Sequence, residues 1–246
     1  MATISAPSPS LRLRAVIFDM DGVVIDSHPA HRKAWHTFLR TLDRDVCDKE
    51  LDYILDGRKR EDILRHLLGN LSPEQLRRYG QQKDAFFQKQ TWQVRPMPGL
   101  LNFLEHLRKR HIPLAIATSA SERRTHLTLK RLHLRHYFAA VITANDVVAS
   151  KPDPAIYRLA CQSLAVTPCE AVAVEDAYSG VQSAKAAGLR CVGIPGDQEA
   201  SRLIAAGANL VLRDLRSITF AALEELLNQD QTTVVPRNLR GPHLHL

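Results

Sequence analysis

The distribution of apolar positions changes character along the chain. Short apolar runs predict buried strands at 15–19, 114–118, 139–143, 171–175, 191–194 and 209–212. Amphipathic segments with helical spacing lie between the later runs, and one of them is closed by Gly188, a residue type common just past a helix C-terminus. This alternation predicts a parallel sheet with helices on both faces, a doubly wound α/β core.

A long helical block interrupts this pattern after the first strand. Apolar residues recur there at helical spacing in two segments: Ala34, Trp35, Phe38 and Leu39, and then Ile63, Leu64, Leu67 and Leu68. Ser72 followed by Pro73 is typical of a helix start. We therefore expect a core formed by 12–28 and 96–228, with an inserted α-helical cap at 29–95. Residues 1–11 and 229–246 lack a pattern and are expected to be a flexible arm and a C-terminal tail.

Composition places the chain among ordinary globular proteins. It has 246 residues, of which 45% are hydrophobic and 24% charged, enough to bury a core without disulfide or metal staples. No stretch approaches the ~20 apolar residues of a membrane span, and no secretory signal is evident, so we expect no membrane association and a cytoplasmic protein. The four cysteines form no CxxC or Cys/His ligand pattern and are interpreted as small buried hydrophobes: Cys47, Cys161, Cys169 and Cys191.

Net charge favours an anionic partner. Lys and Arg number 33 against 26 Asp and Glu, a formal charge of +7. Basicity alone does not separate nucleic acid from a small phosphorylated metabolite. The densest basic run, 123–136, alternates with leucines, which predicts a helix with a solvated basic face. Nucleic acid is therefore not the expected partner.

Polar clusters follow the predicted strands, at the sheet edge where parallel α/β folds bind ligands. Asp19 and Asp21 come at the end of the first strand, and Gly22 permits a sharp turn beside them. Carboxylates two residues apart in an extended segment point to the same side. Because like charges so close repel unless a cation lies between them, and because oxygen ligands suit Mg²⁺, this pair indicates a magnesium site.

Three further clusters complete a set of groups suited to phosphoryl transfer. Thr118 and Ser119 place hydroxyls and backbone N–H groups before a helix, which suits phosphate oxygens. Glu175 and Asp176 are a second acid pair after a strand, and Lys151 supplies one ammonium next to a proline. Phosphoryl transfer depends on such positioning and charge neutralisation. A structural ion pair between an acid and Lys151 is the alternative.

Four segments resemble, in order, the motifs of the haloacid dehalogenase superfamily: DMDGVVIDS, the strand ending in TS, SKPDP and VEDAYSG. The resemblance extends from about 19 to 195 and implies a Rossmann-like core. It also implies that Asp19 is the nucleophile that becomes an aspartyl phosphate. Asp21 would be the general acid/base and would reach the metal through its backbone carbonyl.

The resemblance assigns the other motif residues as well. Ser119 would bind the phosphoryl group, with Thr118 as the alternative hydroxyl. Lys151 would neutralise Asp19 and the phosphate. Asp176, supported by Glu175, would complete the Mg²⁺ site.

Within the cap, the segment GRKREDIL resembles the GxSREDxL segment of the β-phosphoglucomutase group. By this resemblance Arg60 grips a non-transferring phosphate, His31 lies near the acid/base, and Lys83 is a further cap lysine at the substrate. The alternatives are a helix-surface histidine, a solvated lysine, and an arginine paired with Glu61 or Asp62. The chain departs from the group at two positions where serine is usual: Lys59 and Ala177.

These features predict an Mg²⁺-dependent phosphatase that acts on a small phosphorylated metabolite, most simply a sugar phosphate. A phosphomutase of the β-phosphoglucomutase type is the close alternative, because the two differ only in what attacks the phosphoenzyme. A basic nucleic-acid-binding pseudoenzyme is a third hypothesis. We expect a monomer whose cap closes over the core about hinges near 27–29 and 95–96.

Overall fold

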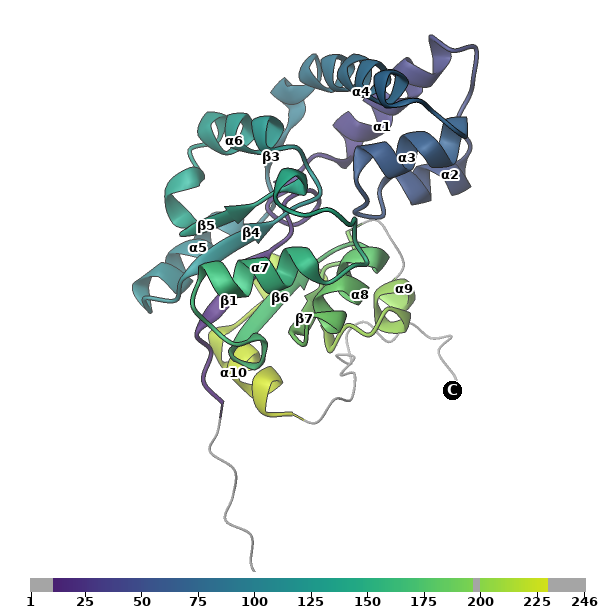
Figure 1. The fold of residues 1–246 in the computed structure, drawn as a ribbon. Coiled ribbons are helices and arrows are strands. Elements are labelled where there is room, and N and C mark those ends of the chain that lie inside the picture. Colours follow the sequence, from purple (N-terminus) through teal and green to yellow (C-terminus); the bar gives the residue numbers. More distant parts are fainter. Residues whose placement is uncertain (1–10, 197–199, 230–246) are drawn as a thin grey trace, which may run out of the picture.

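A six-stranded parallel sheet forms the centre of the core. The structure, a computed structural model, describes residues 11–196 and 200–229 (Figure 1). The strands are β1 (Ala15–Phe18), β4 (Leu114–Ala117), β5 (Ala140–Ile142), β6 (Ala171–Glu175), β7 (Arg190–Gly193) and β8 (Leu210–Val211). Their spatial order is β5-β4-β1-β6-β7-β8. Because β1 pairs with both β4 and β6, the ends of these three strands meet at one edge of the sheet.

Helices cover both faces of the sheet, which confirms the predicted doubly wound fold. Val16 and Phe18 of β1 belong to the apolar cluster on the side of α5 (Leu100–Lys109), α6 (Glu122–Arg131) and α10 (Phe220–Asn228). Ala15 and Ile17 belong to the cluster on the side of α7 (Ala155–Ser163), α8 (Tyr178–Ala186) and α9 (Ala200–Ala205). The alternation follows from the two-residue repeat of a strand. Short 3₁₀ turns are η1 (Thr91–Gln93), η2 (Arg135–Tyr137), η3 (Ala144–Asp146), η4 (Pro168–Glu170) and η5 (Leu215–Ser217).

The predicted helical cap lies at one end of the core (Figure 1). It comprises α1 (His28–Arg40), α2 (Asp48–Ile54), α3 (Arg60–Leu68) and α4 (Pro73–Gln88). These helices have an apolar cluster of their own, in which Trp35 and Phe38 of α1 and Leu64 of α3 are buried. The predicted start of α4 is present, since the Gln75 N–H donates to Ser72 Oγ at 3.2 Å.

Two neighbouring chain segments connect the cap to the core. β2 (Ile25–Asp26) enters α1, and β3 (Arg95–Pro96) follows the cap helices; the two pair as an antiparallel ribbon. The positions predicted as hinges flank or lie within this ribbon. Because the ribbon is short, both chain connections between the cap and the core lie in one place.

Two expectations from the sequence need correction. Cys47 and Cys169 are exposed, and only Cys161 and Cys191 are buried. The exposed pair lies in connecting segments, Cys47 before α2 and Cys169 within η4, where neither residue faces a core.

Leu11 is not part of a loose arm. Its N–H donates to Asn228 Oδ1 at 2.8 Å, and the Asn228 amide donates to the Leu11 carbonyl at 2.9 Å. Both ends of the described chain are thus joined. The rest of the expected arm and of the tail beyond Gln229 lies outside the described residues. Within the described part, no helix has the length and apolar character to span a membrane.

Candidate active site

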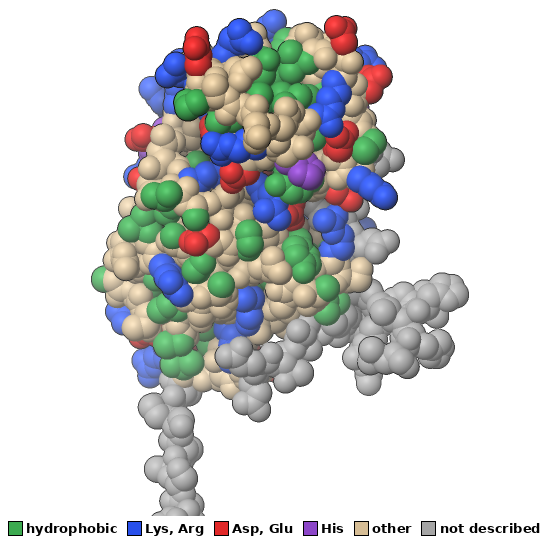
Figure 2. Space-filling view, turned by 45° about the vertical axis from the view of Figure 1, so that its right-hand side comes forward, with side chains coloured by type: hydrophobic (Ala, Val, Ile, Leu, Met, Phe, Trp, Pro, Cys, Tyr) green, Lys and Arg blue, Asp and Glu red, His purple; other side chains and the backbone are tan. Residues whose placement is uncertain are grey.

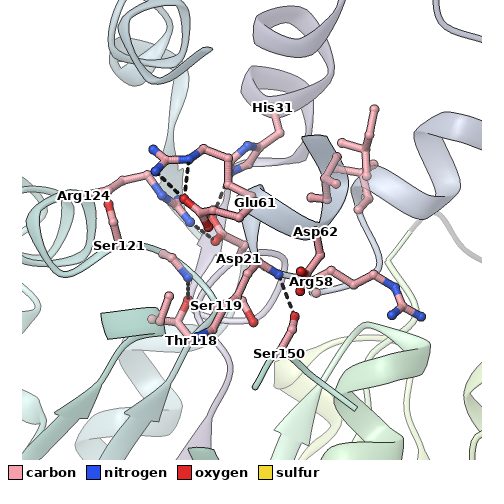
Figure 3. A pocket seen from close by; sticks show the side chains of 18 of the residues that line it. Asp21, His31, Arg58, Glu61, Asp62, Thr118, Ser119, Ser121, Arg124 and Ser150 are labelled. Atoms are coloured by element: carbon pink, nitrogen blue, oxygen red, sulfur yellow. Dashed lines mark hydrogen bonds and ion pairs between the residues drawn. The ribbon is translucent and has the colours of Figure 1, made fainter. Parts of the chain in front are cut away.

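A cavity of about 530 Å³ lies where the strand ends meet the cap. Its wall combines Asp19, Ser119 and Asp176 from the core with His31 and Arg60 from the cap. Charged side chains of both signs gather at the waist between the cap and the core in Figure 2, and Figure 3 shows them converging on the cavity. The structure therefore brings residues far apart in sequence into one polar site.

The floor of the site is a buried group of acids around one lysine. Asp19 directly follows β1, and its N–H donates to the Val174 carbonyl at 2.9 Å. The ammonium of Lys151 donates to Asp19 Oδ1 and to Glu175 Oε1, both at 2.6 Å, and to the Ala117 carbonyl at 3.1 Å. Because the lysine contacts the ends of three strands, it fixes the two carboxylates relative to the sheet.

This group has more negative than positive charge. Carboxylate oxygens of Asp19, Glu175 and Asp176 lie within 4.8 Å of one another. Burial, with the nearby charges of Glu175 and Asp176, raises the pKa of Asp19 well above its usual value despite the opposing effect of Lys151. Burial alone would lower the pKa of Lys151, but Asp19 and Glu175 raise it, so the ammonium is retained. The group sets three carboxyl groups against one ammonium, and this oxygen-rich donor set fits a divalent cation such as Mg²⁺.

Glu175 is the most firmly anchored acid of the three. Its Oε1 accepts from Lys151 and from the Tyr157 hydroxyl at 2.6 Å, and its Oε2 accepts from the Asp176 N–H at 3.2 Å. Gly180 makes room for it, since a Cβ at this position would lie 2.1 Å from Oε1. Glu175 is thus suited to supporting the cluster, as the family resemblance implies.

Asp21 is not one of these three clustered acids, and other partners hold it. Its Oδ1 accepts from Ser27 Oγ at 2.6 Å, and Arg124 makes two contacts, Nη1 to Oδ1 at 2.8 Å and Nη2 to Oδ2 at 2.5 Å (Figure 3). Burial would raise the pKa of Asp21, but Arg124 and His31 outweigh it and hold that pKa well below the usual value. Asp21 is therefore a carboxylate in this arrangement.

The chain makes a tight turn at Gly22, directly after Asp21, and this turn lies against Asp176. Gly22 has a φ of +83°, and a Cβ there would lie 2.0 Å from Asp176 Oδ2. Any side chain at this position would occupy the place of the acid. The glycine is thus required both by backbone conformation and by close approach.

Sequence reasoning missed Arg124. The prediction of a solvated basic face is correct for Arg123 and Lys130, which are exposed, but wrong for Arg124, whose side chain is only 14% exposed. β4 ends at Ala117 and α6 begins at Glu122, so the first turn of α6 lies beside the cavity and Arg124 reaches Asp21. The available signal was its place a few residues after the Thr118-Ser119 strand end.

Thr118 and Ser119 both line the cavity but differ in their surroundings. Thr118 is buried, and its Oγ1 accepts from the Ala120 N–H at 3.1 Å. Ser119 is half-buried. Since the threonine hydroxyl already serves the local turn, Ser119 is the freer of the two to meet a ligand.

On the cap side, Lys83 contacts His31, and His31 in turn contacts Asp21. Lys83 Nζ lies 3.2 Å from His31 Nδ1, and His31 Nε2 lies 3.4 Å from Asp21 Oδ1. His31 also stacks on Phe87 with ring centroids 4.3 Å apart. Lys83 is only 4% exposed and the His31 side chain only 11%, so the alternatives of a surface histidine and a solvated lysine are both wrong.

Their protonation follows from this burial. Burial and the adjacent Lys83 lower the pKa of His31 to about 3, so the ring is neutral near pH 7. Burial lowers the pKa of Lys83 to about 8. Because an ammonium can only donate, the lysine donates to Nδ1, which leaves the ring proton on Nε2, facing Asp21.

Arg60 lies at the cavity wall with two acidic partners. It donates to Glu61 Oε1 through Nε at 3.1 Å and Nη2 at 2.6 Å, and it also pairs with Asp84. Gly80 of α4 makes room for it, since a Cβ there would lie 2.6 Å from Nε. The ion-pair alternative is therefore present for Glu61, while binding of a phosphate by Arg60 stays a prediction.

Lys59 joins the cap to the core. Its ammonium donates to the carbonyls of Val147 at 2.5 Å and Val148 at 3.0 Å, and its backbone N–H donates to Ser150 Oγ at 2.8 Å. These contacts lie on the segment that leads into Lys151. Lys59, at the position where serine is usual, thus joins the cap to the core by hydrogen bonds.

The fold and the site define a class of protein, and the comparison with known proteins agrees. Residues 16–194 match the haloacid dehalogenase-like hydrolase family. The chain belongs to this family, and the predicted resemblance is confirmed.

Individual relatives cover most of the chain. It is 31% identical over 215 residues to hexitol phosphatase A of Escherichia coli, covering 85% of this chain and 94% of the relative. It is 30% identical over 222 residues to beta-phosphoglucomutase of Bacillus subtilis, covering 87% and 95%. The solved structure of CbbY from Rhodobacter sphaeroides in complex with phosphate has a TM-score of 0.77 at 26% identity, covering 86% of this chain and 99% of that one. The chain is therefore an enzyme of a family whose relatives include a phosphatase and a phosphomutase.

Proposed function

We propose that this protein is an Mg²⁺-dependent phosphatase of a small phosphorylated metabolite, a sugar phosphate, and that it works through an aspartyl phosphate on Asp19. The observation that carries the proposal is the buried contact of Lys151 with Asp19 inside a group of three carboxylates. An ion pair with a structural role alone would need one acid for one ammonium. The excess of acids instead suits a site that gathers a divalent cation, which would offset the charge of a bound phosphate.

In the first half-reaction, Asp19 attacks phosphorus. A bond forms between its carboxylate oxygen and phosphorus, and the bond from phosphorus to the ester oxygen breaks. Asp21, a carboxylate at rest, first takes up a proton from solvent and then supplies it to that departing oxygen. Lys151, at 2.6 Å from Asp19, offsets the repulsion between the two anions, and Ser119 is placed to donate to the phosphoryl oxygens.

In the second half-reaction, water attacks the phosphoenzyme. Asp21 takes a proton from the water as its oxygen bonds to phosphorus, and the acyl phosphate bond breaks to return Asp19 as a carboxylate. Inorganic phosphate then leaves. Asp21 releases the proton taken from the water to solvent and is again a carboxylate, as at the start of the cycle.

Asp19 and Asp176, with the Asp21 backbone carbonyl, are the groups that would hold Mg²⁺, and Glu175 would support them. When bound, the ion supplies charge neutralisation at the phosphoryl oxygens. Two side chains complete the site. Lys151 balances part of the negative charge of the buried acids, and Ser119 lines the cavity.

A phosphomutase is the second candidate, and one observation favours it. His31 and Lys83 form a polar pair on the cap next to Asp21. Such a pair could hold a sugar hydroxyl where it attacks the phosphoenzyme. The relatives named above include both activities, so the pair alone does not decide between them.

A panel of hexose, hexitol and pentose phosphates tests the proposal. With Mg²⁺, the wild-type protein is expected to release inorganic phosphate, and Asp19→Asn to lose at least about a thousandfold of that activity. β-Glucose 1-phosphate with a trace of the bisphosphate separates the candidates, since conversion to glucose 6-phosphate without phosphate release would establish the mutase. Unchanged activity of Asp19→Asn would refute both. Binding of nucleic acid that weakens steeply with salt, without any phosphatase activity, would instead support the pseudoenzyme.

A further inference from the structure

The carboxylate of Asp21 is anchored mainly from the core. Arg124 lies on core helix α6, and Ser27 lies at the junction before α1. Together they make three contacts of 2.8 Å or less with Asp21. The cap contributes the longer contact of His31, at 3.4 Å.

The two oxygens of Asp21 differ in what they can still accept. Oδ1 accepts from Ser27 and from Arg124 Nη1, and His31 Nε2 lies 3.4 Å from the same oxygen, so Oδ1 is fully occupied. Among the described residues, the contact found at Oδ2 is the one with Arg124 Nη2. One position on Oδ2 is therefore open to the oxygen of a reacting group while the arginine stays in place.

Among the described cap residues, the side-chain contact found with Arg124 is an aromatic face, and the charge of Asp84 on α4 also acts on the guanidinium. The guanidinium carbon lies 5.2 Å from the centroid of Phe87 on α4. This contact favours a cation but occupies none of the N–H donors of the guanidinium. If the cap moved away, the guanidinium would lose a ring face and would keep its bidentate pair with Asp21.

We propose that Arg124 is a positioning residue that holds Asp21 ready for reaction from the core side, and that it thereby favours water as the group that attacks the phosphoenzyme. The inference rests on the proposed function. A base held by the core stays in position when the cap is open and water has access to the site. A base held by the cap would be in position only when the cap excludes water, which favours transfer to a bound hydroxyl.

The step affected is the breakdown of the phosphoenzyme. Water oxygen bonds to phosphorus, its proton passes to Asp21 Oδ2, and the bond from phosphorus to Asp19 breaks. Arg124 takes no proton and forms no covalent bond in this step. Its contribution is the orientation of the oxygen that receives the proton.

Rapid-quench measurements of Arg124→Ala, Arg124→Lys and the wild-type protein test this role with a phosphorylated substrate and Mg²⁺. Arg123→Ala is the matched control, since Arg123 is the exposed neighbour on the same helix. In Arg124→Ala we expect phosphoenzyme breakdown to slow about 10- to 100-fold, with KM changed less than about threefold. Arg124→Lys should restore only part of the rate because lysine cannot form the two-point contact. Added guanidinium should accelerate the alanine variant and not the control.

The partition between acceptors gives a second readout. In the presence of an added polyol, the ratio of hydrolysis to transfer should fall in Arg124→Ala relative to wild type. Breakdown and partition equal to wild type would overturn the inference, as would a loss confined to KM, which would make Arg124 a substrate-binding group. Slow breakdown without guanidinium rescue, in a variant of lowered melting temperature, would also count against it. A wild-type protein that forms no phosphoenzyme would instead overturn the proposed function itself.

Discussion

His28 Nε2 lies 3.2 Å from Asp176 Oδ2, so the first residue of the cap contacts a candidate metal ligand of the core. Burial alone would lower the pKa of His28, but the hydrogen bond and negative charge of Asp176 raise it above its usual value. The imidazolium therefore persists to a higher pH than in a free histidine. A proton on His28 and a cation at Asp176 compete for the same carboxylate.

This competition makes Mg²⁺ affinity depend on pH. His28 is charged below its raised pKa and loses its charge as pH rises through it, so Mg²⁺ should bind more tightly at about pH 8 than at about pH 6. Titration calorimetry at the two pH values measures the change. His28→Gln keeps a donor to Asp176 without the charge and should show a smaller pH dependence. An unchanged slope in this variant would show that another group controls the affinity.

Substrate binding should weaken as pH rises through about 8. Lys83 has a pKa of about 8 because of its burial, and it loses its positive charge above that value. KM for a phosphorylated substrate should therefore rise on the alkaline side. Lys83→Met should have a raised KM at every pH without this alkaline rise. Lys130→Met, at an exposed position on α6, should keep the wild-type profile, and a wild-type profile in Lys83→Met would contradict the assignment.

Gly180→Ala should damage the site through Glu175. The new methyl group would overlap the carboxylate that binds Lys151 and Tyr157, so either the acid or helix α8 must shift. We expect a loss of about 1–3 kcal/mol in unfolding free energy and a marked fall in kcat. Chemical denaturation and steady-state kinetics measure the two effects. Ala186→Ser, at an exposed position of the same helix, serves as the control. Normal activity in Gly180→Ala would mean that the position of Glu175 is unimportant.

Lys59→Met should loosen the cap. The substitution keeps an unbranched chain but removes two donations to core carbonyls, at Val147 and Val148. Hydrogen exchange of the amides at 56–62 and 143–151 should become faster, and the ligand-dependent change in the small-angle scattering profile should become larger. Lys49→Met, on the exposed side of α2, should leave both unchanged. Exchange at the wild-type rate in Lys59→Met would show that this lysine does not hold the cap.

The core was accessible to sequence reasoning because its signals are local. The run AVAVE corresponds to β6, and Gly188 follows α8 closely, since short buried strands and helix ends depend on adjacent residues. The motif residues Asp19, Lys151 and Asp176 meet because each follows a parallel strand or lies beside one, and such strands end at the same edge of the sheet.

The features of the site that the sequence did not predict depend on the direction in which individual side chains point. Periodicity placed Arg124 on a basic helix but carried no information on the overlap of its first turn with the cavity. Lys83 resembles any helix-surface lysine in sequence, and only the packing of α1 against α4 buries it beside Trp35 and His31. The free energy of such buried charges depends on partners distant in sequence, which local pattern does not contain.

Acid quenching of the wild-type protein during turnover, followed by peptide mass spectrometry, tests most directly whether Asp19 becomes phosphorylated. The proposed mechanism requires an acyl phosphate on Asp19, lost on treatment with hydroxylamine and absent from Asp19→Asn. Turnover with no phosphoryl group on Asp19, or with the group on another residue, would contradict it.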